Sequence, residues 1–355
     1  MKSTLVKKIN AAEVRCVSTD SSKCKSECCD YFAVHPSSSE LSLKDKLDGC
    51  KVRWGINRMG YTVEPGIYGI GNPSEDAPVL VTANYKLTFD AVRKELAGLD
   101  CYVLVLDTKG VNVWCAAGKG TFGTDELVSR IKAVRLPDIV THKKLIVPQL
   151  GAPGVDGREV KRQTGFAVEF GPVRASDIKA FISAGSKASG DMREVKFTLR
   201  DRLAVVPIEL VLTAKIALVV FGILLLINLV AQRPFGVNDF LLYISSIVVG
   251  AVVVPALLPF IPGRAFAFKG WLLGIFSTVG ILWAFGWLAS PFLLLAAGYI
   301  LVLPAHSAFI AMNFTGASTY TSPSGVLKEM KTALPLIVFS TVVGIILLLI
   351  KAFIG

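Results

Sequence analysis

The chain has 355 residues, of which 52% are hydrophobic, and its formal net charge is +11. Of its 65 Asp, Glu, Lys and Arg residues, ten lie in the 153 positions from Leu203 to Gly355, which argues for a soluble part followed by a membrane part and excludes a single soluble domain. The basic residues are interspersed with acids and form no basic–aromatic array, so cytoplasmic loops and anionic lipid explain the charge better than nucleic acid does.

The first segment, from Met1 to about Leu47, is polar and weakly periodic, so we expect a flexible lead-in over residues 1–47. It has no apolar h-region, so we expect no secretory signal and a reducing cytoplasmic environment. Cys24, Cys28 and Cys29 could bind a soft metal ion, but no second pair has zinc-finger spacing, and the lead-in interpretation is favoured. All seven cysteines are expected to be thiols: Cys16, Cys24, Cys28, Cys29, Cys50, Cys101 and Cys115.

From Pro78 the pattern alternates between short apolar strands and amphipathic helices. The predicted strands are Val79–Thr82, Tyr102–Leu106, Leu145–Val147 and Phe166–Phe170. The predicted helices are Leu87–Leu99, Thr124–Val134, Asp156–Thr164 and Ser176–Ile182. Uninterrupted apolar strands are typical of a parallel sheet covered on both faces. We therefore predict an α/β, Rossmann-like domain over residues 48–202, with its ligand at the carboxyl ends of the strands.

Residues 203–355 are predicted to form an all-α transmembrane domain of five helices, each close to the ~20 residues that a bilayer requires. The spans are expected at about 211–230, 240–260, 271–289, 291–312 and 333–350. Only Ser290 separates the third and fourth spans, and we expect it to cap the next helix, with Pro291 at that helix's first position. A hairpin results.

The loop charges predict the orientation of the spans. An inside set of six basic residues faces an outside set of two; the inside set is Arg200, Arg202, Arg264, Lys269, Lys328 and Lys331, and the outside set is Arg233 and Lys351. This asymmetry favours a multi-pass protein of the cytoplasmic (inner) membrane, with the N-terminal domain inside and the C-terminus outside. His306, within the fourth span, is expected to make a helix–helix hydrogen bond. Anchoring and positioning is the favoured role for this domain.

A small-residue segment follows the second predicted strand. Its residues are Asn112, Val113, Trp114, Cys115, Ala116, Ala117, Gly118, Lys119 and Gly120. The small side chains leave backbone uncovered, so something flat or bulky could lie close to it. Cys115 stands at a strand-to-helix transition near Lys119, and both features favour a thiolate. The residues alone leave a second interpretation equally open, a buried turn with an inert cysteine.

The stretch from Asn112 to Lys119 resembles the cap-helix motif of the HgcA family, the corrinoid proteins of the HgcA–HgcB mercury-methylating pairs. The likeness extends over Pro78–Ala175, through the segments Val81–Lys86 and Pro148–Gly154, and includes the membrane domain of five spans. More distantly, the soluble part resembles the corrinoid domain of the corrinoid iron–sulfur protein of the acetyl-CoA pathway.

The resemblance implies a bound corrinoid, a cobalamin-like cobamide, with Cys115 as the lower axial ligand of its cobalt. The implied cofactor-binding residues are Asn112, Val113, Trp114, Cys115, Ala116, Ala117, Gly118, Lys119, Gly120, Thr82, Asn84, Tyr85, Gln149 and Gly151. Lys119 is either a contact of a corrin amide or a solvated helix residue. Gln149 to Gly154 form either a plain loop or a contact of the cofactor's nucleotide tail.

The implied activity is that of a corrinoid-dependent methyltransferase, passing a methyl carbanion equivalent from methyl-Co(III) to Hg(II) and forming methylmercury. A thiolate ligand donates electron density and suits this mode of cleavage. The implied partners are a ferredoxin-like iron–sulfur protein, HgcB, as electron donor and a methyl-tetrahydrofolate-linked methyl donor.

Two other functions compete with mercury methylation. One is a membrane-bound corrinoid methyl carrier in acetyl-CoA or one-carbon metabolism, which would gain nothing from a strong thiolate ligand. The other is a transporter with a cytoplasmic sensing domain, which the apparent absence of buried charges from the spans disfavours.

Overall fold

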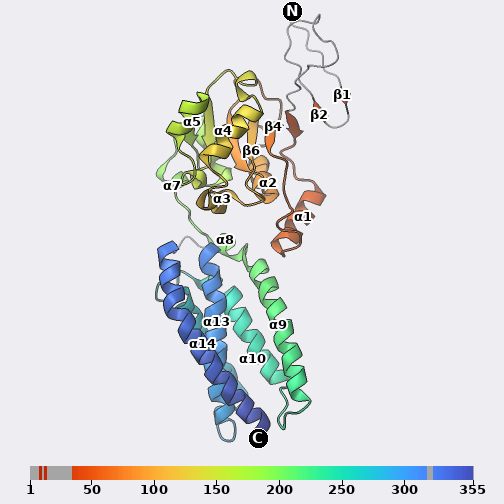
Figure 1. Cartoon of the computed structure of the whole chain (residues 1–355), viewed down its shortest axis with the longest axis vertical. Coiled ribbons are helices and arrows are strands. Elements are labelled where there is room, and N and C mark those ends of the chain that lie inside the picture. The colour runs from red at the N-terminus through yellow and green to blue at the C-terminus, as the bar shows by residue number, and fades with distance from the viewer. Residues whose placement is uncertain (1–7, 10–11, 14–33, 318–322, 355) are drawn as a thin grey trace, which may run out of the picture. The chain divides into compact units, whose positions relative to one another are not determined.

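The computed structural model describes residues 8–9, 12–13, 34–317 and 323–354 (Figure 1). The chain divides into two units: an α/β unit of Met1–Val52 and Ile56–Val195, and a helical unit of Arg53–Gly55 and Lys196–Gly355. The predicted fold class, an α/β domain followed by a helical region with five apolar helices, is confirmed.

The α/β unit is built on a six-stranded sheet in the order β3-β4-β6-β5-β7-β8. The strands are β3 (His35–Ser37), β4 (Gly66–Ile70), β5 (Val79–Ala83), β6 (Cys101–Leu106), β7 (Lys144–Val147) and β8 (Ala167–Phe170). A separate antiparallel pair joins β1 (Lys8–Ile9) to β2 (Ala12–Glu13). The four predicted strands, β5 to β8, run parallel as expected, whereas β4 is antiparallel to β6. Glycines in β4 and a central Pro36 in the short β3 explain why neither was predicted.

Helices cover both faces of this sheet. They are α1 (Leu43–Arg53), α2 (Lys86–Glu95), α3 (Val113–Lys119), α4 (Thr124–Ala133), α5 (Gly157–Thr164), α6 (Ile178–Ser183) and α7 (Gly190–Arg193). Side chains around α3, α4 and α5, such as Phe122, Leu127 and Phe166, form one core cluster with Val81 and its strand neighbours. Leu80 points to the opposite face, where α2 and α6 form the second cluster, as the two-residue period of a strand requires.

The predicted flexible lead-in is wrong for its last part. Residues 35–37 pair with β4 in the sheet, and α1 already begins at Leu43. Apolar periodicity gave no signal here because ion pairs, rather than a buried apolar face, hold this segment against α2. Cys16, Cys24, Cys28 and Cys29 lie outside the described residues.

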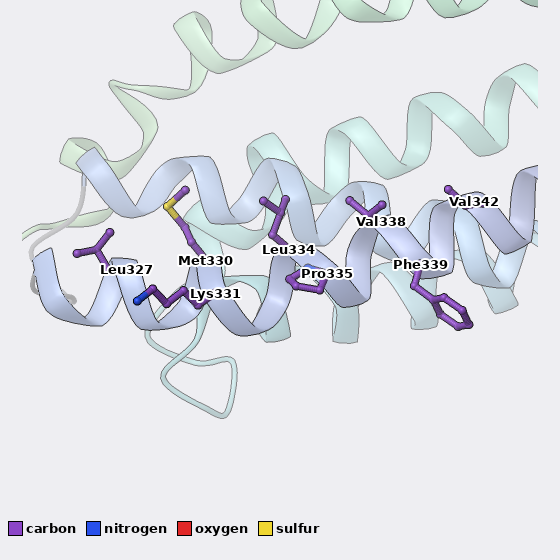
Figure 2. Close-up of a pocket in the computed structure, with 8 residues that line it drawn as sticks. All are labelled: Leu327, Met330, Lys331, Leu334, Pro335, Val338, Phe339 and Val342. Carbon is purple, nitrogen blue, oxygen red and sulfur yellow. The ribbon is translucent and has the colours of Figure 1, made fainter.

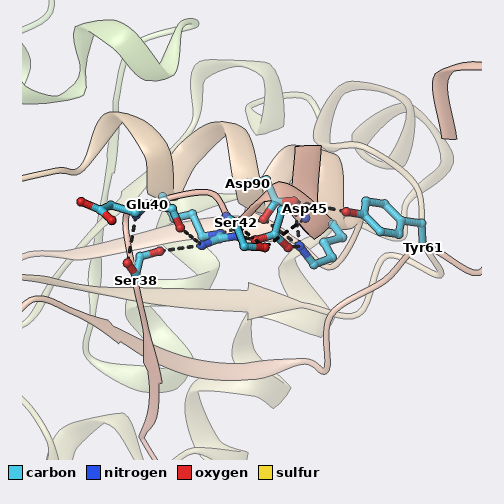
Figure 3. A network of polar contacts seen from close by, with 8 residues as sticks. Ser38, Glu40, Ser42, Asp45, Tyr61 and Asp90 are labelled. Atoms are coloured by element: carbon cyan, nitrogen blue, oxygen red, sulfur yellow. Dashed lines mark hydrogen bonds and ion pairs between the residues drawn. The ribbon is translucent and has the colours of Figure 1, made fainter. Parts of the chain in front are cut away.

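A network of charged side chains fastens this segment to α2 (Figure 3). Asp45 of α1 accepts from Lys86 Nζ at 2.6 Å and from Arg93 Nη2 at 2.9 Å. Asp90 accepts from the same two cations, and Arg93 also donates to the backbone carbonyls of residues 38 and 40. Burial works to raise the pKa of Asp45, but hydrogen bonds from Lys86, Ser42 and Arg93 outweigh it and hold that pKa well below its usual range.

Asp45→Asn is expected to lower the free energy of unfolding of the α/β unit by about 1–2 kcal/mol at pH 7, because it removes the charge that pairs with Lys86 and Arg93. Since the folded-state pKa of Asp45 is depressed, its contribution is complete above the ordinary carboxyl pKa of about 4 and is lost as the pH falls below it. Urea unfolding should therefore show the gap from wild type narrowing below about pH 4. Asp48→Asn, on the same helix, is the control and should change little; a pH-independent gap would contradict the assignment.

The helical unit contains five helices that are long and apolar enough to cross a membrane, within the part of the chain that the structure describes. They span Leu199–Asn228, Val237–Leu257, Phe266–Ala284, Leu293–Asn313 and Ser324–Ile354. In the labels of Figure 1, the first comprises α8 (Leu199–Leu203) and α9 (Val206–Asn228). The second comprises α10 (Val237–Val248), η4 (Val249–Val253) and α11 (Val254–Leu257). The last three are α12 (Phe266–Ala284), α13 (Leu293–Asn313) and α14 (Pro323–Ile354). Each of the five predicted segments coincides with one of these helices, and the first and last helices are much longer than predicted.

The hairpin between α12 and α13 is present, but its predicted capping is wrong. α12 ends at Ala284, α13 begins at Leu293, and Phe292 occupies the N-cap position. Ser290 and Pro291 therefore lie in the connecting turn. Apolar composition continues through this turn, which is why hydropathy placed the helix ends too close together.

Buried charges are present in the helical unit, contrary to the sequence-based prediction. Asp239, Lys269 and Glu329 are each less than one-tenth exposed. Each precedes a predicted span by a few residues, and each is buried because the helices begin earlier than hydropathy indicated. Their contacts are structural: Asp239 accepts from Tyr299 Oη, Lys269 donates to two backbone carbonyls, and Glu329 accepts from the amide of Ala267. The predicted helix–helix bond of the fourth span is confirmed, between His306 Nδ1 and Ser246 Oγ at 2.8 Å.

Small residues bring α12, α13 and α14 into close contact. A Cβ on Gly274 of α12 would lie 2.8 Å from the Cα of Pro304 in α13. A Cβ on Gly344 of α14 would lie 2.8 Å from the carbonyl oxygen of Gly298 in α13. Such approaches are typical of helices that associate within a bilayer, where van der Waals packing replaces the hydrophobic driving force.

The outer side of α14 presents an open apolar surface (Figure 2). Its residues are Leu327, Met330, Lys331, Leu334, Pro335, Val338, Phe339 and Val342. An apolar face with one cation at its end is what a lipid-facing helix presents, because a lysine can extend to the headgroups.

Gly274→Leu is expected to lower the free energy of unfolding of the helical unit by about 1–3 kcal/mol, and so its melting temperature, because the new side chain would clash with the backbone of α13. Gly280→Leu is the matched control in the same helix, since a Cβ there meets no atom of the described chain within 4 Å. Thermal unfolding in detergent compares the two variants. Equal loss in both would show that α12 does not pack as described.

Candidate functional site

A cleft lies at the carboxyl ends of the parallel strands, where the strand order reverses. β5 and β7 are neighbours in the sheet; the chain continues from β5 to β6 towards one edge of the sheet, and from β7 to β8 towards the other edge. In open α/β sheets, this switch point is where ligands bind. The cleft has a volume of about 340 Å³, and it includes the predicted site residues Thr82, Asn112, Val113 and Trp114. The cleft thus lies at the edge of the sheet where the sequence placed the ligand, and binding there stays a prediction.

Thr82, at the end of β5, contributes a buried polar atom to this cleft. The residue is 1% exposed, and its Oγ1 has no hydrogen-bond partner among the residues that the structure describes. A buried hydroxyl without a partner is costly, so such groups are uncommon in native proteins and point to a missing partner such as a ligand. The cleft is lined mainly by apolar residues, and the buried Thr82 hydroxyl is available to orient a bound molecule.

The helix α3 has two different faces. Asn112 caps it, with Oδ1 accepting from the amide of Cys115 at 2.9 Å. Val113, Ala116 and Ala117 are buried in the core. Four residues are exposed on the opposite face: Trp114, Cys115, Gly118 and Lys119. The small residues therefore serve two purposes that the sequence did not separate, since the alanines pack inward and the glycines leave space outside.

Gly118 provides that space beside Cys115. A Cβ on Gly118 would meet no atom of the described residues within 4 Å, and it lies one helical turn from Cys115 on the exposed face. Gly120 ends α3 in the left-handed conformation, at φ 80°, and its amide donates to the carbonyls of Ala116 and Ala117. The thiol of Cys115 is thus presented on a short, capped helix with an open surface around it.

The loop after β7 packs directly against α3. A Cβ on Gly151 would lie 2.4 Å from the Phe122 ring, and one on Gly154 would lie 2.1 Å from the Phe122 carbonyl oxygen. Gln149 accepts from Arg193 Nη1 at 2.8 Å. Gly151 therefore acts through close packing, and the predicted contact of Gln149 and Gly151 with a cofactor stays a prediction.

Asn84 holds the turn that leads into α3. Its Oδ1 accepts from the amides of Thr108 and Gly110, and its Nδ2 donates to Asp107. Tyr85 is 6% exposed, and the Arg58 guanidinium lies 5.9 Å from its ring centroid. Asn84 therefore positions the turn through bonds within the protein, and a direct contact of either residue with a cofactor remains a prediction.

Sequence reasoning missed part of the cleft. Its remaining walls come from α2, from the segment after β8 and from α6; they include Thr88, Ala91, Val92, Pro172, Val173 and Ile178. The segment after β8 could have been found, because Gly171 and Pro172 follow a predicted strand at its carboxyl end. The contribution of α2 depends on packing and leaves no motif.

Cys101 and Cys115, which lie on either side of the turn after β6, differ in their exposure to solvent. Cys101 is fully buried at the start of β6, and burial, with a smaller effect of Asp100, raises the pKa of its thiol to about 12. Cys115 is exposed. Cys101 therefore packs in the core, whereas the thiol of Cys115 is accessible at the surface.

Residues 56–182 match the family model described as CO dehydrogenase/acetyl-CoA synthase delta subunit. The acetyl-CoA decarbonylase/synthase complex subunit gamma of Methanopyrus kandleri is 38% identical over 122 residues, 34% of this chain and 26% of the relative. The corrinoid/iron–sulfur protein large subunit of Moorella thermoacetica is 35% identical over 124 residues, 34% of this chain and 27% of the relative. The chain thus spans about a quarter of the length of these relatives. They support the more distant resemblance, to corrinoid proteins of the acetyl-CoA pathway, and do not single out the mercury-methylating family.

Thr82→Val is expected to raise the free energy of unfolding of the ligand-free protein by about 1 kcal/mol, because it replaces a buried, unpaired hydroxyl with a methyl group of similar size. Thr108→Val is the matched control: its equally buried Oγ1 lies 2.6 Å from the carbonyl of Val111 and 2.9 Å from Asn84 Oδ1, so this change should destabilise by about 1–2 kcal/mol. Chemical denaturation measures both. A loss of stability in Thr82→Val would show that its hydroxyl is already satisfied.

Proposed function

We propose that this chain is a membrane-anchored corrinoid protein that takes part in methyl transfer. The observation that carries the proposal is the combination of a cleft at the switch point, an unpaired Thr82 hydroxyl within it and an exposed Cys115 beside it. All three lie within residues 56–182, the segment that matches the family model. The Moorella relative is named as a corrinoid protein, which supports the same cofactor here.

The residues present fit a large, flat group. The exposed face of α3, with Trp114, Cys115 and Gly118, offers apolar surface, a metal ligand and free space. Thr82 would supply a hydrogen bond to a polar substituent within the cleft. When bound, a corrinoid supplies a cobalt centre that accepts and releases a methyl group.

Cys115 is proposed as the protein ligand of that cobalt. Its side chain is exposed, and the Asn112 cap fixes the helical turn that bears it, so little conformational freedom is lost when the thiolate binds a metal. Lys119 lies one turn further along the exposed face of α3.

Methyl transfer to Hg(II) is the second, finer candidate, and the exposed thiol is the observation that favours it. A thiolate ligand from Cys115 would donate electron density to the metal, which favours departure of the methyl with both bonding electrons. Hg(II), as an electrophile, accepts a methyl in that form. A methyl carrier in one-carbon metabolism, which the relatives favour, delivers the methyl to a nucleophile instead.

The partners follow from the same proposal. A thiolate-ligated cobalt is difficult to reduce, so the protein would require a low-potential electron donor, for which a ferredoxin-like iron–sulfur protein such as HgcB is suited. A tetrahydrofolate-linked compound is proposed as the methyl donor. The five apolar helices would anchor the chain in the cytoplasmic membrane, with the α/β unit inside and the C-terminus outside, as the loop charges predict.

The test is an electronic spectrum of the full-length chain in detergent with added cobalamin. Wild type should show a cobalt–thiolate band, and Cys115→Ala should lack it, because the sulfur is the proposed ligand. Thr82→Val should keep the band but bind cobalamin about 5- to 10-fold more weakly, since one hydrogen bond is lost.

Cys50→Ala is the matched control, since Cys50 is also exposed, and Cys101→Ala controls for loss of a core thiol. Both should keep the band. A wild-type spectrum identical to that of Cys115→Ala would remove the ligand assignment, whereas absence of cobalamin binding would remove the whole proposal. Methylmercury formation that requires Cys115 would then distinguish the mercury candidate from the methyl carrier.

A further inference from the structure

The outer face of α1 carries apolar side chains that belong to none of the core clusters of the described residues. Leu43 is 78% exposed and Leu47 is 62% exposed, and Cys50 on the next turn is exposed as well. At about 100° per residue, these three positions fall within about 60° of one another on the helix. They form one narrow stripe, which we call the α1 stripe. Trp54, 46% exposed, follows directly after the helix.

Lysines flank the α1 stripe on both sides. Lys44 and Lys51 lie along one border and Lys46 lies along the other, by the same helical spacing, and all three are exposed. Of the acidic residues of α1, Asp45 faces α2, and Asp48, whose side chain is 28% exposed, accepts from Lys51 Nζ at 3.2 Å. An apolar strip with cations at its edges is therefore the surface that this helix presents.

The inner contacts of α1 fix this orientation. Asp45, labelled in Figure 3, accepts hydrogen bonds from Lys86 and Arg93 of α2. A Cβ on Gly49 would lie 3.2 Å from the Leu87 side chain. The helix cannot turn its apolar stripe inward without breaking these ion pairs. Exposure of the stripe is thus built into the α/β unit.

We infer that the α1 stripe docks on an anionic lipid surface, lying in the plane of the bilayer interface. A helix with an apolar stripe and bordering lysines matches an interfacial helix, whose apolar side chains enter the headgroup region while the lysines extend to the phosphates. Charge complementarity selects anionic lipid, because all three exposed bordering side chains are cationic. The five apolar helices of the same chain make a bilayer available to it. This inference is independent of corrinoid binding.

The experiment uses the full-length chain in vesicles, with an environment-sensitive fluorescent amino acid at position 47 and nitroxide-labelled lipid headgroups as quenchers. In vesicles containing phosphatidylglycerol, quenching should be at least about twofold greater than for the same label at position 132 on α4. In pure phosphatidylcholine vesicles this excess should fall to near zero, since the lysines lose their partners.

Charge reversal provides the matched comparison. The triple variant Lys44→Glu, Lys46→Glu and Lys51→Glu should abolish the excess quenching, whereas Lys132→Glu, Lys161→Glu and Lys187→Glu should leave it unchanged. All six lysines are exposed, and far-ultraviolet circular dichroism checks that both variants fold. Equal quenching at positions 47 and 132 would overturn the inference. So would excess quenching that ignores lipid charge, or a label at position 47 already shielded in detergent, which would assign the stripe to a protein surface.

Discussion

The side-chain amide of Asn84 joins the carboxyl ends of two neighbouring strands. It follows β5, while the groups that it binds, at Asp107, Thr108 and Gly110, follow β6. The chain leaves this turn to form α3, so one buried carboxamide determines where the exposed thiol of Cys115 stands relative to the cleft. Because the bonds to Thr108 and Gly110 are buried, loss of the amide would leave buried polar groups without partners, and the helix would lose its fixed starting point.

The elements that could be predicted from sequence are those with a strong local signal. The buried run of β6 and the five apolar helices follow from hydrophobic pattern alone. β4, with its two glycines, and α1, with its polar composition, depend on partners distant in sequence: β6 for the first and the ion pairs of Asp45 for the second. The same contrast holds in the site, where the α3 segment carries a motif and the α2 wall of the cleft does not.

The segment that matches the family model lies within the α/β unit. The family match ends at residue 182, before the helical unit begins. What the α/β unit shares with its relatives is therefore the segment that contains the cleft, together with Cys115 and Thr82. The five helices that are long and apolar enough to cross a membrane follow the matched segment in this chain.

Glu329 belongs to α14, yet it accepts a hydrogen bond from Ala267 in the first turn of α12. The opening amides of a helix have no partner within that helix, and a hydrocarbon environment offers no water in exchange. The first turn of α12 therefore depends on a carboxylate from α14, which is synthesised later. In a bilayer, the amide of Ala267 would have this partner only after α14 is inserted, so the helical bundle would mature as a set and not helix by helix.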